Sequence, residues 1–128
     1  MFKRIDHVEV IASDFERTLR FYSDVFGFQM RERITIPDHP PLMEVAYLTL
    51  GDTTLEVLHF GNPEPAAAPG PRVGYCALAL EVEAMDEAVA YLATKGIHPT
   101  VPPVDVGGGS LRGEIVDPDG LTIELRQW

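Results

Sequence analysis

The chain has 128 residues and a mass of 14.1 kDa, a size that fits one compact domain or two small halves with a shared core. Hydrophobic residues make up 45% and charged residues 23%, which is the balance of a folded globular protein and not of a disordered chain. The 20 acidic and 10 basic residues give a formal net charge of −10, which disfavours nucleic acid and anionic membranes as partners. Cys76 is the single cysteine, so an intrachain disulfide framework and a cysteine-rich zinc site are excluded.

No apolar run approaches the roughly 18 residues that a membrane-spanning helix needs. The amino terminus lacks the apolar stretch of a secretory signal. We therefore expect a reduced, cytoplasmic protein that does not associate with membranes.

The first 60 residues predict one strand, one helix and three further strands. Residues 4–11 alternate and are rich in β-branched side chains, which favours a strand. Ser13 or Asp14 can cap the following helix, and Gly27 occupies the position where a helix ends in the left-handed conformation. Residues 28–36, 43–50 and 53–60 then predict three strands, the last two joined by a tight turn at Gly51-Asp52.

Residues 61–74 contain four prolines and three consecutive alanines, a composition that indicates a linker. The pattern of the first half then repeats. The predicted elements are a strand at 75–83, a helix at 86–94 that stops at Gly96, and strands near 97–102, 111–116 and 121–127. Asp117-Pro118-Asp119-Gly120 predicts the turn of the last hairpin.

The first strands of the two halves are related by a shift of 70 residues, which places Val8 on Leu78 and Val10 on Leu80. The last strands of the halves also match, because Thr54-Leu55-Glu56-Val57 corresponds to Thr122-Ile123-Glu124-Leu125. We interpret this order as a duplication. The predicted fold class is α+β: two tandem βαβββ modules, 1–60 and 75–128, joined by the linker 61–74 within a single domain. Their strands would form a cupped mixed sheet with the helices on its outer face.

Strand parity and the repeat single out one imidazole and two carboxylates. His7 lies in the first predicted strand, Glu56 in the last strand of the first half, and Glu124 at the equivalent place in the second half. A mixed nitrogen and oxygen ligand set of this kind suits Zn, Ni, Co, Mn or Fe. The residues alone leave another interpretation open, in which His7 is a structural histidine and both acids face solvent.

Four segments of the chain together form a family pattern: Ile5-Asp6-His7-Val8, Phe21-Tyr22-Ser23-Asp24-Val25-Phe26-Gly27-Phe28, Leu55-Glu56-Val57 and Asp117-Pro118-Asp119-Gly120-Leu121-Thr122-Ile123-Glu124. These segments resemble the vicinal oxygen chelate superfamily, which includes glyoxalase I, methylmalonyl-CoA epimerase, extradiol dioxygenases and the fosfomycin and bleomycin resistance proteins. The resemblance spans the whole chain. It implies paired βαβββ modules, a cupped sheet that holds a divalent metal, and a homodimer.

Under this resemblance, His7, Glu56 and Glu124 match three of the four metal-ligand positions of the family. The fourth is normally a histidine, and the 70-residue shift places it at Ala77, whose methyl group cannot bind a metal. The metal could remain on three ligands, bind weakly, or be lost in favour of a metal-free pocket. His39, in the proline-rich loop, is a remote candidate for the missing ligand. Cys76, beside Ala77, is expected to be a small core residue.

The resemblance implies a glyoxalase-like metalloprotein, a lyase, isomerase or epimerase that acts on a small oxygenated substrate through enolate stabilisation. Glu56 or Glu124 would transfer the proton. Glutathione-using members often carry an arginine where this chain has Ile11, and extradiol oxygenation would need a second histidine at Ala77. The alternative is a resistance-type protein that binds a small molecule without metal or with weakly bound metal.

Overall fold

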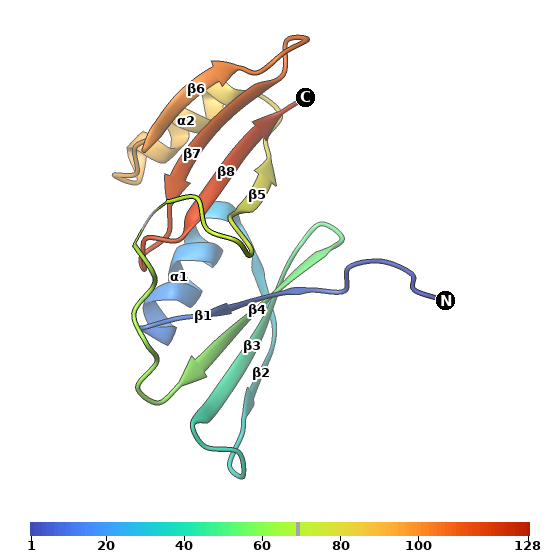
Figure 1. The fold of residues 1–128 in the computed structure, drawn as a ribbon. Coiled ribbons are helices and arrows are strands. Elements are labelled where there is room, and N and C mark those ends of the chain that lie inside the picture. The colour runs from blue at the N-terminus through green and yellow to red at the C-terminus, as the bar shows by residue number, and fades with distance from the viewer. Residues whose placement is uncertain (69) are drawn as a thin grey trace. The chain divides into compact units, whose positions relative to one another are not determined.

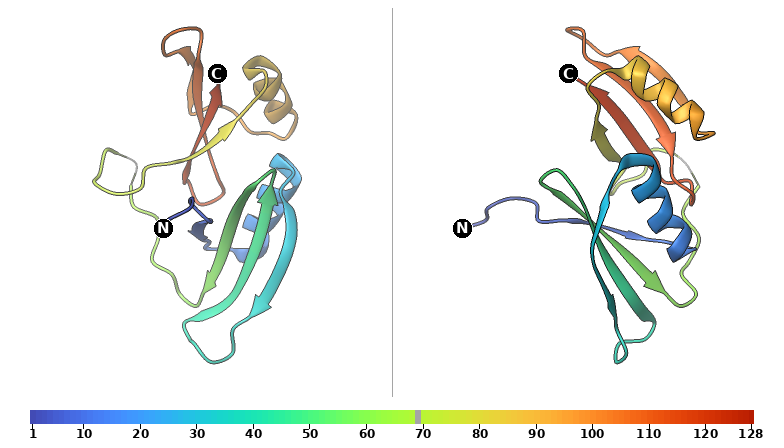
Figure 2. Two further views of the ribbon diagram at one scale, coloured as in Figure 1. Left: turned by 90° about the vertical axis from the view of Figure 1, so that its right-hand side faces the viewer. Right: turned by 180° about the vertical axis from the view of Figure 1, so that it is seen from behind.

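The computed structural model describes residues 1–68 and 70–128. These form two compact units, Met1–Pro65 and Ala66–Trp128. Each unit contains one helix and one four-stranded mixed sheet (Figures 1 and 2). The predicted α+β class and the tandem βαβββ order are therefore confirmed.

Unit 1 has the sheet order β1-β4-β3-β2, in which β1 is parallel to β4 and the other neighbours are antiparallel. Its elements are β1 (Val8–Ile11), α1 (Phe15–Phe26), β2 (Gln29–Thr35), β3 (Leu42–Leu50) and β4 (Thr53–Phe60). Both predicted helix signals are confirmed: the Asp14 carboxylate accepts a hydrogen bond from the Arg17 amide at 3.0 Å, and Gly27 adopts φ 79°.

The core of unit 1 lies between α1 and one face of its sheet. The helix contributes the buried side chains of Phe15, Leu19 and Tyr22. Strand alternation turns Leu55 and Val57 of β4 toward the same side, and both are almost fully buried. Glu56 lies between them in sequence and so belongs to the opposite face, which the helix does not cover.

Unit 2 repeats this topology with the order β5-β8-β7-β6, and β5 is parallel to β8. Its elements are β5 (Leu78–Glu81), α2 (Met85–Thr94), β6 (Val101–Asp105), β7 (Leu111–Val116) and β8 (Thr122–Gln127). The predicted hairpin turn is confirmed: the Asp117 carboxylate accepts hydrogen bonds from the amides of Asp119 and Leu121, both at 2.9 Å.

Both first strands are shorter than the sequence predicts, because each pairs only with the last strand of its own unit. In unit 1, Val8 pairs with Leu55 and β4 begins at Thr53. Residues 4–5 therefore lie opposite the turn that precedes β4 and have no strand residue to pair with. In unit 2, Leu78 pairs with Ile123, and the turn at 117–120 ends the ladder in the same way. Residues 75–77 therefore precede β5, and the prediction of a strand over 75–83 is wrong at both ends.

Two further expectations for unit 2 are wrong. Cys76 is exposed and not a core residue, because it lies outside the sheet. The strand expected near 97–102 is β6, at Val101–Asp105. Ile97 cannot begin it, because its amide donates to the carbonyl of Leu92 and closes the end of α2.

Candidate functional site

His7, Glu9 and Glu56 meet on the face of the unit 1 sheet that α1 leaves uncovered. The parallel register of β1 and β4 places Glu9 directly opposite Glu56. Alternation along the chain turns the side chain of His7 to the same side as that of Glu9. The backbone pairing thus brings together three groups that lie up to 49 positions apart in the sequence (56 − 7).

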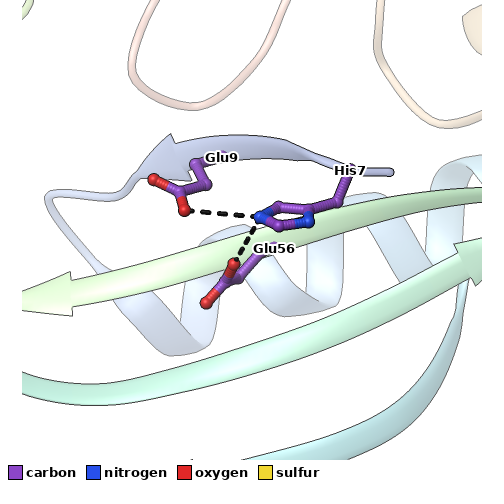
Figure 3. A group of neighbouring side chains, drawn as sticks. All are labelled: His7, Glu9 and Glu56. Atoms are coloured by element: carbon purple, nitrogen blue, oxygen red, sulfur yellow. Dashed lines mark hydrogen bonds and ion pairs between the residues drawn. The ribbon is translucent and has the colours of Figure 1, made fainter. Parts of the chain in front are cut away.

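The imidazole of His7 is the centre of this group. Its Nε2 lies 3.0 Å from Glu56 Oε2 and 3.4 Å from Glu9 Oε1 (Figure 3). One ligand atom from each of the three side chains lies within 4.8 Å of the other two. The predicted proximity of His7 and Glu56 is thus present within one unit, and Glu9 joins them.

Asp6 holds the other nitrogen of the ring. Its Oδ2 lies 2.9 Å from His7 Nδ1. A carboxylate at Nδ1 fixes the ring orientation and directs Nε2 toward the two glutamates, as carboxylates commonly do behind metal-bound histidines. The hydrogen bonds to Asp6 and Glu9 raise the pKa of His7, and the hydrogen bond to His7 lowers the pKa of Asp6.

Glu56 is the most buried member of the site, since only 9% of its side chain is exposed. A buried carboxylate is costly unless a positive charge or hydrogen-bond donors compensate it. Besides His7, its neighbour is Tyr47, which lies directly opposite Glu56 on β3. Burial, together with the charge and hydrogen bond of Glu56, raises the pKa of Tyr47, so the phenol remains a proton donor.

The donor set in unit 1 fits a divalent cation. One imidazole nitrogen and two carboxylates lie within reach of a common centre, and these are ligand types that Zn, Ni, Co, Mn and Fe accept. Sequence reasoning missed Glu9 and Asp6. Glu9 could have been found from its parity with His7, whereas the Asp6 contact depends on the course of the chain before β1, for which the sequence contains no clear signal.

Unit 2 has the same strand register but different side chains. Ala79 pairs with Glu124, just as Glu9 pairs with Glu56. Ala79 therefore occupies the position of Glu9, and Ala77, two residues earlier, corresponds to His7. The strand pairing supports the 70-residue shift and places no imidazole beside Glu124 on β5.

Two arginines bind the carboxylate of Glu124. Arg112 Nε donates to Glu124 Oε2 at 2.9 Å, and Arg126 Nη1 donates to Glu124 Oε1 at 3.4 Å. Arg112 is also paired with Glu114, and this hydrogen bond, with that to Glu124, raises the pKa of the Arg112 guanidinium. The negative charge of Glu124 is thus compensated within its own unit, whereas Glu56 has His7 as its only cationic partner among the described residues.

His39 and the remaining histidines lie outside the three-residue group. His39 is in the exposed loop between β2 and β3. His59 is half-buried and stacks on Phe15, with ring centroids 5.2 Å apart. Among the described residues, no helix is long and apolar enough to cross a membrane.

Comparisons with known proteins agree with this fold. A family model described as the Glyoxalase/Bleomycin resistance protein/Dioxygenase superfamily matches residues 4–125. Human mitochondrial methylmalonyl-CoA epimerase is 28% identical over 131 residues, covering 97% of this chain and 73% of that protein. A lactoylglutathione lyase from Arabidopsis thaliana is 30% identical over 127 residues, covering 98% of this chain and 44% of that protein.

Among solved structures, the glyoxalase family protein from Enterococcus faecalis matches with a TM-score of 0.85 and 31% identity, and the match covers 98% of each chain. The family match spans both units and includes His7, Glu56 and Glu124. The chain therefore belongs to the glyoxalase/bleomycin resistance protein/dioxygenase superfamily, the vicinal oxygen chelate proteins that its sequence resembles.

Proposed function

We propose that this protein is a divalent-metal-dependent enzyme, a lyase, isomerase or epimerase, that moves a proton on a small oxygenated substrate. The observation that carries the proposal is the meeting of His7, Glu9 and Glu56 on the open face of unit 1. Membership of the superfamily and the likeness to an epimerase and a lactoylglutathione lyase support it.

The metal would be held by His7 Nε2 and the carboxylate of Glu56, with Glu9 as a further donor from the same face. Glu124 remains the candidate ligand from unit 2, and one of its oxygens would have to leave an arginine to serve. A bound cation would supply Lewis-acid polarisation of a substrate oxygen, which acidifies the neighbouring C–H bond and stabilises the enolate.

The protein's own groups provide proton transfer and orientation. Glu56 is the proposed base, because its carboxylate is buried and is contacted by the imidazole of His7 and the phenol of Tyr47. Tyr47, kept protonated, donates to this carboxylate and fixes its position. Asp6 fixes His7 from behind. Glu124 is the second candidate base by its equivalent position, but both its oxygens already accept hydrogen bonds from arginines.

The second candidate function is a binding protein of the resistance type, without metal or with weakly held metal. The exposed methyl groups of Ala77 and Ala79 favour it, because they leave space where unit 1 carries His7 and Glu9. A bulkier ligand could occupy that space without undergoing chemistry.

The test is proton exchange with and without metal. Chelator-treated protein is incubated in deuterium oxide with methylmalonyl-CoA, and separately with the hemithioacetal of methylglyoxal and glutathione. Zn, Ni, Co, Mn or Fe(II) is then added. We expect metal-activated deuterium incorporation or turnover that falls at least about a hundredfold in Glu56→Gln, the loss typical of a missing general base. The exposed Glu87→Gln on α2 is the matched control and should retain activity.

Turnover that is indifferent to chelator and added metal, or that survives in Glu56→Gln, contradicts the proposal. Absence of turnover and of metal binding in the wild-type protein, with stoichiometric binding of a small molecule, supports the binding-protein alternative instead.

A further inference from the structure

Two arginine clusters lie on the sheets, and they differ in how completely their hydrogen-bond donors are used. Arg33 in unit 1 donates from Nε and Nη2 to Glu44 at 2.7 and 3.0 Å and is also paired with Glu16. Its guanidinium lies over the ring of Phe15, 5.0 Å from the centroid. Arg33 therefore uses both Nε and Nη2 in charged hydrogen bonds, as a structural residue does.

Arg126 in unit 2 is far less engaged. Among the described residues, the guanidinium of Arg126 has one side-chain hydrogen bond, the long one from Nη1 to Glu124 Oε1 at 3.4 Å. Its Nε is buried and has no hydrogen-bond partner among the residues that the structure describes. A guanidinium has five N–H donors, and leaving a buried one unpaired costs about 1–3 kcal/mol. Such a donor indicates a missing acceptor.

The strand register adds a second guanidinium beside the first. Arg112 and Arg126 are direct partners across β7 and β8, and Glu114 and Glu124 form the next pair along the same face. Like charges directly opposite one another are unfavourable unless counter-charges lie nearby. Glu124 serves both arginines, but Glu114 is paired only with Arg112. Among the described residues, Arg126 is therefore paired with Glu124 alone, and it shares that carboxylate with Arg112.

Trp128 covers this arginine. The guanidinium carbon lies 4.1 Å from the centroid of the indole ring, a cation–π contact that holds the guanidinium in a fixed plane. The indole is itself 76% exposed, so little packing opposes its displacement. The chain has one tryptophan, and this residue therefore reports directly on events at Arg126.

We propose that Arg126, aided by Arg112, forms a recognition subsite for the carboxylate of a small organic anion on the open face of unit 2. The planar guanidinium matches the two oxygens of a carboxylate, and the anion would supply the acceptor that Arg126 lacks. The proposed subsite lies entirely within unit 2 and is independent of the proposed metal site. The binding itself requires no metal.

The test uses chelator-treated full-length protein at low ionic strength, where charge screening is weak. Malonate is titrated while the fluorescence of Trp128 is followed, and calorimetry measures the same binding without depending on the indole. Dimethyl malonate, which has no charge, and inorganic phosphate are the comparison ligands. Sodium chloride at matched ionic strength is the blank.

We expect saturable binding of malonate, a fluorescence change on binding, and no binding of the diester. Arg126→Gln should weaken malonate binding at least tenfold, whereas Arg126→Lys should recover part of it. Arg20→Gln on the exposed surface of α1 should bind as the wild type does. Glu114→Gln should tighten binding, because it removes a carboxylate that competes with the anion for Arg112.

Malonate binding that is equal in the wild type and in a folded Arg126→Gln variant overturns the proposal, as does the absence of calorimetric binding to the wild type. Equal affinity for phosphate overturns the assignment to carboxylates. Metal-activated deuterium exchange is measured separately, so failure of the subsite and failure of the proposed enzyme are distinguishable.

Discussion

His7 is the residue on which the candidate metal site depends, and its two ring nitrogens have separate tasks. Nδ1 is bonded to Asp6, whereas Nε2 faces Glu56 and Glu9. The hydrogen bond to Asp6 favours the tautomer that a metal needs, with the proton on Nδ1 and the lone pair on Nε2. In the metal-free protein the same carboxylates favour the protonated ring, so protons and metal compete for one nitrogen.

Asp6→Asn should weaken metal binding about tenfold, because the ring loses the carboxylate that orients it and increases its basicity. Competition with a chromophoric chelator measures the dissociation constant. The control is Asp38→Asn in the exposed loop between β2 and β3, which should leave the constant unchanged. An unchanged constant in Asp6→Asn would mean that Asp6 does not support the site.

The hydrogen bonds between Arg33 and Glu44 predict that the stability of the fold depends on pH. Its hydrogen bonds lower the pKa of Glu44 below the ordinary value of 4.5. A carboxyl with a lowered folded-state pKa stabilises the fold above its unfolded pKa, and this contribution is lost as pH falls through the folded value. Arg33→Gln should therefore unfold at lower urea concentration than the wild type at pH 7, and the difference should shrink below about pH 4. A difference independent of pH would contradict this account of the cluster.

The sequence predicted His7 and Glu56 because strand parity and the internal repeat can both be read directly from the order of the residues. It could not predict that Arg112 and Arg126 bind Glu124. Arg112 lies on the neighbouring strand, and its reach to Glu124 depends on the β7–β8 register and on side-chain rotamers. The same limit applies to Arg33, which joins residues of α1 and β3.

At the scale of elements, α1 follows its sequence signals closely. The cap at Asp14 and the left-handed Gly27 are both local signals, and the helix begins and ends where they indicate. By contrast, β1 and β5 are bounded by the turns that precede their partners, β4 and β8. Strand length therefore depended on pairing, which short-range periodicity does not contain.

Asp14→Ala should lower the free energy of unfolding by about 1 kcal/mol, since it removes the side-chain acceptor of the Arg17 amide at the start of α1. Chemical denaturation followed by circular dichroism measures the change. Arg20→Ala, on the exposed face of the same helix, should alter stability by a few tenths of a kcal/mol at most. A loss no larger than that of Arg20→Ala would show that the cap contributes little.

At the scale of the whole molecule, two units share one topology and one register but carry different chemistry. Unit 1 keeps an imidazole and two carboxylates on its open face, whereas unit 2 has alanines at the positions of His7 and Glu9 and arginines beside Glu124. We propose that this division separates metal binding from anion recognition. The homodimer that the resemblance implies remains a proposal, and sedimentation equilibrium would test it.

The central claim is that the chain binds a divalent metal through His7. The most direct measurement is the metal content of protein purified without chelator, followed by titration of the stripped protein with zinc or nickel. We predict one ion per chain in the wild type and in the exposed control His98→Ala, and loss of that ion in a folded His7→Ala variant. Wild-type protein that binds no metal in the titration, or His7→Ala protein that binds it equally well, would contradict the account.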